Sequence, residues 1–263
     1  MKMPVRKTIT PAIAKELLAR GGVNRNISQG WVEYLAGEIR AGNWRFSHSG
    51  IGINDKGHVI DGQHRLMAVI AANQPVDMLV AQYEKTDSRD VMDVIDVNKS
   101  RTPNDILAIA GWSIPGFKNI GGCIKLVMTR GVSRGRVSHI EIKKAVRKLE
   151  DGLRFVAEHM PSVGKQPKGV ATAQVKAVIV RAYYARPQQR VRLAGFCRVL
   201  LSGKRNSASD DAAISLRDLL TQSVMRDAIH VSEAYRKIEW ALHHFLNQKP
   251  QDRIQSASSE MFP

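Results

Sequence analysis

Segments typical of β-strands occur only in the first third of this chain. Three of them precede residue 85, at 51–54, 58–60 and 76–82. The turn Asp55-Lys56-Gly57 joins the first two into a hairpin. Beyond about residue 112, apolar residues recur at helical spacing instead. We therefore expect an α+β fold class, with a small N-terminal α+β unit followed by an all-α unit.

Capping and helix-breaking residues divide the chain into three parts. Residues 1–112 hold the strand segments, and helices are expected after Thr10, Ser28, Gly62, Ser88 and Thr102. Residues 113–248 are expected to form helices near 115–130, 138–150, 174–185, 188–201, 211–221 and 231–247. Residues 249–263 are polar and weakly patterned, which predicts a flexible tail.

Basic residues greatly outnumber acidic ones. The 263 residues include 40 Lys+Arg and 24 Asp+Glu, which gives a formal net charge of +16 and a pI near 10.1. One basic cluster lies in 130–148, and a second span, between Glu158 and Asp210, has ten Lys or Arg and no acidic residue. This excess favours a polyanionic partner, which we expect to be DNA. The residues expected to contact nucleic acid are Lys176, Arg181, Arg186, Arg190, Arg192 and Arg198. The alternative is a solvated helix surface.

The two cysteines indicate no metal site and no disulfide framework. Cys123 and Cys197 lie far apart in apolar surroundings, as expected for thiols in a reducing compartment. No apolar run approaches the roughly 18 residues of a spanning helix, and no apolar core of a signal peptide follows the basic N-terminus. We therefore expect a soluble cytoplasmic protein with no membrane partner, and the sequence allows an oligomer without indicating its size.

The most distinctive local pattern is Asp61-Gly62-Gln63-His64-Arg65, at an expected strand-to-helix junction. Gly62 permits a tight turn, and the unpaired amides and dipole of the next helix favour an anion there. Arg65 would add a bidentate phosphate contact, and His64 would donate or shuttle a proton. Asp61 would orient one of these groups or act as a base. We therefore expect phosphate binding by Gly62, Gln63, His64 and Arg65, and catalytic roles for Asp61, His64 and Arg65.

These five residues, together with Ala68, resemble the Gly-x-His-Arg or Gly-x-Arg-Arg type of box in the ParB/sulfiredoxin superfamily. Residues 8–112 more closely resemble the ParB-like proteins of phages and mobile elements that carry a DGQHR box. The resemblance implies a ParB/sulfiredoxin-like domain with a small mixed sheet, in a bacterial host cell. It also implies a nucleoside triphosphate with Mg²⁺ as cofactor. Gln63 replaces the cysteine that sulfiredoxin needs in this box, so sulfinic-acid reduction is not expected.

In the proteins that this chain resembles, the box precedes a segment like residues 94–101. Lys99 and Arg101 would converge on the same phosphates, beside Asn98, with Asp96 on a cation or a ribose. An equally weighted alternative is a helix C-terminus, where basic residues complement the dipole. The histidines lack cysteine or carboxylate partners at ligand spacing, so no metal ion held by the protein alone is expected. A Mg²⁺ carried by a nucleotide remains compatible.

Three functions fit these features. The first is a nucleotide-binding protein that acts on DNA through phosphoryl transfer or hydrolysis. The second is a Mg²⁺-dependent nuclease, which needs clustered carboxylates that are sparse near Asp61. The third is a non-enzymatic protein that binds or regulates DNA, and an assay for phosphate release separates it from the first.

Overall fold

The computed structural model describes residues 3–21, 27–83, 102–132, 136–162, 167–222, 228–250 and 253–263. The chain divides into two compact units, 1–100 and 101–263. This division precedes the boundary expected at residue 112. The reason is α5 (Pro103–Ile109), which packs against helices of the second unit and buries Leu107 in the core of that unit.

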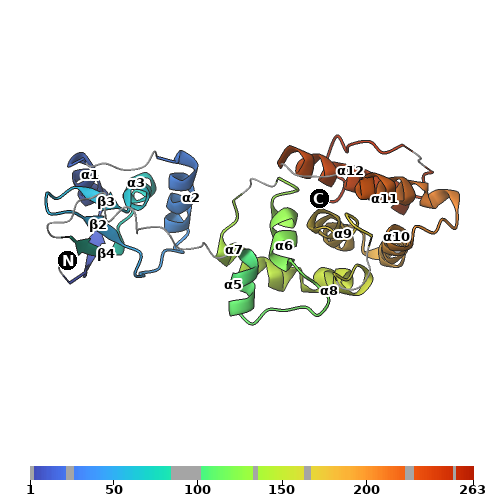
Figure 1. The fold of residues 1–263 in the computed structure, drawn as a ribbon, viewed down its shortest axis with the longest axis horizontal. Coiled ribbons are helices and arrows are strands. Elements are labelled where there is room, and N and C mark those ends of the chain that lie inside the picture. Colours follow the sequence, from blue (N-terminus) through green and yellow to red (C-terminus); the bar gives the residue numbers. More distant parts are fainter. Residues whose placement is uncertain are drawn as a thin grey trace. The chain divides into compact units, whose positions relative to one another are not determined.

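The first unit combines a mixed sheet with helices (Figure 1). Its described elements are β1 (Val5–Ile9), α1 (Pro11–Ala19), α2 (Gln29–Arg40), β2 (Ile51–Ile53), β3 (Val59–Asp61), α3 (Gln63–Ala72) and β4 (Val76–Gln82). The strand order is β1-β4-β2-β3. β4 runs antiparallel to β1 and parallel to β2, and β2 runs antiparallel to β3. The expected α+β unit with a small mixed sheet is confirmed.

The edge strand β1 was not expected from the sequence. Only Ile9 of this strand is buried, so the strand lacks the alternation that predicts β-structure. A cross-strand polar cluster stabilises it instead. Arg6 Nη2 lies 2.5 Å from Asp77 Oδ2, and Thr8 Oγ1 donates to Asp77 Oδ1 at 2.6 Å. The Thr8 hydrogen bond, followed by the Arg6 contacts, holds the pKa of Asp77 below its usual value.

α3 is the central helix of the first unit and packs against both α1 and α2. Leu66, Ala68 and Val69 are fully buried on it. They join one apolar core with residues of the sheet such as Ile51 and Met78. Because α3 follows β3 after a single residue, the packing of this helix also fixes the position of the turn at Gly62.

The second unit is helical, and its described residues contain no strand. After α5 come α6 (Ile120–Met128), α7 (His139–Lys148), α8 (Glu150–His159), α9 (Ala173–Ala185), η1 (Pro187–Gln189), α10 (Arg190–Ser202), η2 (Ala208–Asp210), α11 (Asp211–Gln222) and α12 (Ala228–Leu246). α8 was not expected, because it follows Leu149 directly and begins without a side-chain cap. None of the described helices is long and apolar enough to cross a membrane.

α9 forms the centre of the second unit. It packs against α6, α8, α10 and α12 (Figure 1). Apolar residues on all sides of this helix have no exposed surface, and they are Val175, Ala177, Val178, Ile179, Val180 and Ala182. Such all-round burial is typical of a core helix. The helix also carries two cations, Lys176 and Arg181, into the interior.

Residues 253–263 pack against the helices of the second unit, which corrects the expectation of a flexible tail. Phe262 has no exposed surface and Ala257 is 3% exposed, and both belong to the core. Glu260 Oε2 lies 2.9 Å from Arg130 Nη1, and Glu260 also pairs with Arg181. These anchors are single residues without periodicity, so the sequence pattern did not indicate them.

Candidate functional site

The DGQHR residues form the turn between β3 and α3. Gly62 is the N-cap residue of α3 and has a φ of 92°, in the left-handed region. A Cβ atom at this position would lie 3.0 Å from the Gly50 carbonyl oxygen and 3.2 Å from Ile51 Cα. Conformation and space therefore both favour glycine at this turn.

A carboxylate already lies at the N-terminal end of α3, where the sequence predicts an anion site. Asp61 Oδ1 accepts a hydrogen bond from the Gly62 amide at 2.6 Å. The same oxygen lies 3.5 Å from Arg65 Nη1, and the two side chains are 25% and 21% exposed. This distance is long for a charge-assisted hydrogen bond. A guanidinium has five N–H donors, and those of Arg65 have no other partner within the described ranges.

His64 links α3 to the start of α2. The side chain is buried, and its Nε2 accepts a hydrogen bond from the backbone amide of Ser28, the N-cap residue of α2, at 3.0 Å. A ring nitrogen that accepts from an amide carries no proton, so this contact favours a neutral imidazole. Proton transfer through Nε2, as expected for a catalytic His64, would have to break this hydrogen bond.

Gln63 leaves an unsatisfied polar atom at the same turn. Its Oε1 is buried and has no hydrogen-bond partner in the described structure. A buried acceptor without a donor costs about 1–3 kcal/mol, so a donor group from a ligand would be stabilised here. The other predicted nucleotide-binding residues lie outside the described residues, and they are Asp96, Asn98, Lys99 and Arg101. The described residues contain no group of three or more His, Cys, Asp or Glu side chains that could hold a metal ion.

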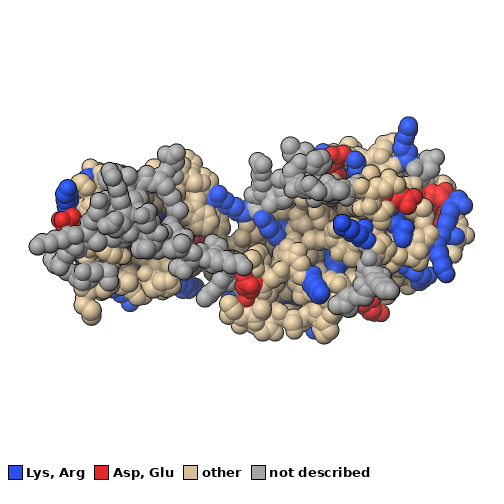
Figure 2. All heavy atoms as spheres, viewed as in Figure 1, with Lys and Arg blue, Asp and Glu red and all other residues tan. Residues whose placement is uncertain are grey.

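Nearly all of the net positive charge belongs to the second unit. Residues 101–263 contain 27 of the 40 Lys+Arg and 13 of the 24 Asp+Glu, a net charge of +14. Residues 1–100 have a net charge of +2. Figure 2 shows the Lys and Arg side chains of the second unit spread over the face in view, with fewer acidic ones among them.

Two of the six predicted nucleic-acid contacts belong to the core. Lys176 is 2% exposed. The side chain of Arg181 is 9% exposed and pairs with Glu239 Oε1 at 3.6 Å and with Glu260. The expectation that these two residues form part of a surface for the DNA backbone is corrected, because burial on α9 removes both from the surface.

Arg190 and Arg192 are half-buried and hydrogen-bond to backbone carbonyl groups. Arg190 Nε donates to the Tyr183 carbonyl oxygen at 3.3 Å, and its guanidinium lies 3.8 Å from the centroid of the Tyr183 ring. Arg192 Nε donates to the Phe245 carbonyl oxygen at 2.8 Å and lies over the Phe245 ring. These contacts attach α10 to its neighbours, so both guanidinium groups have structural roles.

The remaining accessible cations lie elsewhere. Arg186 and Arg198 are exposed. On α7, Ile142 and Val146 are buried, and the opposite face carries exposed cations. We define the α7 basic face as Lys143, Lys144, Arg147 and Lys148. Their spacing places them in one stripe along the helix, and their side chains have no ion-pair partner among the described residues.

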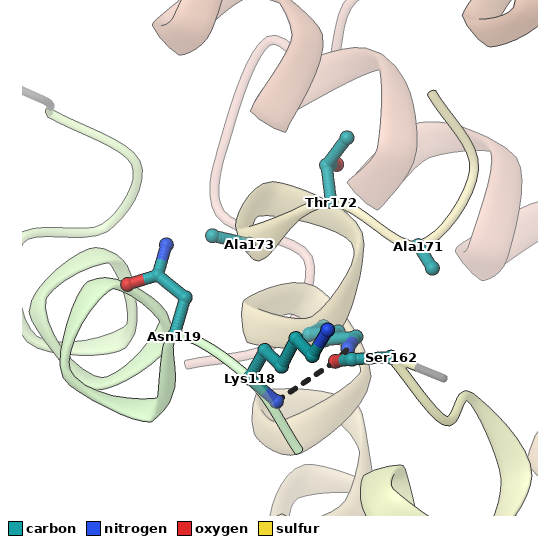
Figure 3. A pocket seen from close by; sticks show the side chains of 7 residues that line it. Lys118, Asn119, Ser162, Ala171, Thr172 and Ala173 are labelled. Atoms are coloured by element: carbon teal, nitrogen blue, oxygen red, sulfur yellow. Dashed lines mark hydrogen bonds between the residues drawn. The ribbon is translucent and has the colours of Figure 1, made fainter. Parts of the chain in front are cut away.

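Sequence reasoning missed a cavity of about 360 Å³ in the second unit (Figure 3). Its lining residues are Lys118, Asn119, Ser162, Ala171, Thr172, Ala173 and Lys176. They come from the loop before α6, the residues after α8 and the start of α9, so no local motif joins them. The one available signal is a lysine within the otherwise apolar segment 175–180.

No family model, curated protein or solved structure matches this chain. The fold and the candidate site define a mixed-sheet unit with a glycine turn at a helix start, followed by a basic helical unit. Function is inferred from the geometry and chemistry of these residues.

Gly62→Ala should destabilise the first unit by at least about 1–2 kcal/mol, the cost of a left-handed conformation for a residue with a side chain. The close approach of the Gly50 carbonyl adds to this cost. Gly37→Ala is the matched control, because a Cβ on this residue of α2 would meet nothing within 4 Å. It should stabilise the unit by about 0.5–1 kcal/mol. Chemical denaturation measures the free energy of unfolding of both variants. Similar effects of the two substitutions would contradict the left-handed turn assigned to Gly62.

Proposed function

We propose that this chain is a nucleic-acid-binding protein whose second unit binds the phosphodiester backbone of DNA. The observation that carries the proposal is the net charge of +14 in residues 101–263, against +2 in residues 1–100. An excess of one sign repels itself in a compact fold and attracts a polyanion. Part of this charge is exposed and has no acidic partner, above all on the α7 basic face.

The α7 basic face matches a duplex in charge density. Residues 143–148 span about 8 Å of helix axis at a rise of about 1.5 Å per residue. Four cations lie within that length. Duplex DNA presents about one phosphate charge per 1.7 Å of its axis. Lysine and arginine contacts to phosphates carry no base information, so we expect sequence-tolerant binding.

Nucleotide binding by the first unit is a second candidate function, which the turn at Asp61–Arg65 favours. Gly62 allows close approach of a phosphate, Arg65 has unused donors, and Gln63 Oε1 lacks a donor. A triphosphate bound at this turn would draw Arg65 away from Asp61 into a bidentate contact. The Asp61 carboxylate, still hydrogen-bonded to the Gly62 amide, would then be available to a Mg²⁺ that the nucleotide carries. This is the use of the turn that the ParB-like resemblance implies, with hydrolysis or phosphoryl transfer coupled to DNA.

Replacement of Lys143, Lys144 and Arg147 by Glu should weaken the binding of duplex DNA. Each neutralised phosphate contributes about 0.9 to the slope of log K against log salt. If each of the three side chains neutralises one phosphate, the slope should flatten by about 2.7. Fluorescence anisotropy with a labelled duplex between about 50 and 200 mM salt covers the range where backbone binders lose most affinity.

The control is a triple reversal of Lys7, Lys15 and Lys56 to Glu. These exposed residues belong to the first unit, and their reversal changes the net charge by the same amount. The slope should stay near that of the unaltered protein. If both triple variants flatten the slope of log K against log salt equally, net charge alone determines DNA binding, and the assignment of the contacts to α7 would be wrong. If the unaltered protein fails to bind DNA at about 50 mM salt, the proposed function is wrong.

Arg65→Ala should weaken nucleoside triphosphate binding by about 1.5–3 kcal/mol, the contribution of a hydrogen bond to a charged group. Arg20→Ala is the control in the same unit, because Arg20 is exposed and pairs with Glu16 at 2.7 Å. Calorimetric titration with ATP and CTP in the presence of Mg²⁺ measures the nucleotide affinity of both variants. Equal affinity of the unaltered protein and Arg65→Ala would exclude this turn as the nucleotide site. A phosphate-release assay then separates hydrolysis from binding alone.

A further inference from the structure

Lys176 places an ammonium group at the cavity wall, from the buried middle part of helix α9. Its side chain lies at the cavity wall and is 2% exposed. Nζ donates to Ser162 Oγ and lies 4.6 Å from the centroid of the Phe117 ring. An ammonium group has three N–H donors. The described residues provide Lys176 with no carboxylate and no second hydrogen-bond acceptor.

Arg181, on the same helix, has the charge compensation that Lys176 lacks. Arg181 pairs with Glu239 and Glu260 and donates to Tyr235 Oη at 3.4 Å. Buried charges normally require such partners, because burial removes their hydration. Of the two cations on this helix, Arg181 thus has counter-charge among the described residues and Lys176 has none.

The Cys123 thiol, whose charge would raise the pKa of Lys176, cannot supply that counter-charge near neutral pH. Burial raises the pKa of the Cys123 thiol to about 12, so the thiol is neutral there. Burial also lowers the pKa of Lys176, and the opposing influence of Cys123 is weaker. An external anion in the cavity would therefore compensate the charge of the Lys176 ammonium group, for which the described residues provide no counter-charge.

The rest of the cavity wall also favours an anion. Lys118 is exposed at the mouth, and no described residue forms an ion pair with its ammonium group. The wall includes Asn119 and Thr172, the N-cap residues of α6 and α9, so the positive ends of two helix dipoles meet here. Figure 3 shows Lys118, Asn119 and Ser162 around the same space as Thr172 and Ala173 at the start of α9.

We propose that this cavity binds a phosphate monoester, with Lys176 at its floor and Lys118 at its mouth. The dianionic group would accept hydrogen bonds from the unused donors of Lys176 and receive counter-charge from both lysines. The volume of about 360 Å³ lies within the range of small-ligand pockets, about 300–1,000 Å³, so a ligand the size of a nucleoside monophosphate fits. The same chemistry occurs in a free phosphate ester and in the terminal phosphate of a nucleic-acid strand. The proposal does not depend on DNA binding by the α7 basic face.

Calorimetric titration of the full chain with inorganic phosphate and with AMP tests this site. Lys176→Met should weaken binding by about 10-fold or more, as expected for the loss of a charge-assisted contact. The thermal unfolding temperature of the Lys176→Met variant should match or exceed that of the unaltered protein, because the substitution removes an uncompensated buried charge. Lys118→Ala should also weaken binding, and since this side chain is exposed and unpaired, the substitution leaves the core intact. Lys125→Met, on α6 but outside the cavity lining, should bind both probes normally.

Two oligonucleotides of one sequence, with a 5′-phosphate or a 5′-hydroxyl group, distinguish the two sources of the phosphate. Preference for the 5′-phosphate in the unaltered protein, lost in Lys176→Met, would identify a strand end as the ligand. Binding of AMP or phosphate without that preference would identify a small molecule. The proposal is overturned if the protein binds neither small probe and shows no 5′-phosphate preference, or if Lys176→Met and Lys118→Ala both bind as the unaltered protein does.

Discussion

The second unit depends on the burial of the middle part of α9, where apolar residues on all sides of the helix have no exposed surface. Four other helices pack around this apolar helix, so each charge that it carries must be compensated or exposed to a cavity. Arg181 is compensated by Glu239 and by Glu260, which belongs to the C-terminal residues that pack beside Phe262. Lys176 has no carboxylate partner among the described residues and lies at a cavity wall. The ordering of the C-terminal residues and the candidate ligand site thus follow from the same constraint.

The large positive charge of the sequence divides into groups with different roles. The guanidinium groups of Arg190 and Arg192 attach α10 to neighbouring backbone carbonyls, so they are structural. Lys118 and Lys176 line a cavity whose size suits a small ligand rather than a duplex. The α7 basic face is exposed and lies opposite the buried side of its helix. Exposed cations such as these are available to a long polyanion without rearrangement of the core.

Local features of the structure could be predicted from the sequence, and non-local ones could not. The turn at Gly62 was predictable because a strand end, a glycine and a helix start are adjacent in the chain. The strand β1 was not predictable. Asp77, whose side chain stabilises this strand, lies about 70 residues away in the sequence, and only Ile9 of the strand is buried. The basic span without acidic residues predicts Lys176 at the surface. Its burial results from the packing of several distant helices, and the same holds for Phe262.

The central claim is that exposed cations of the second unit bind nucleic acid. Lysine-directed chemical labelling of the full chain, read by mass spectrometry with and without duplex DNA, measures the accessibility of individual side chains. The account predicts that Lys143, Lys144 and Lys148 lose reactivity when DNA binds, whereas Lys7 and Lys15 of the first unit keep theirs. Protection of the first-unit lysines alone, or no protection on α7 when DNA is bound, would contradict it.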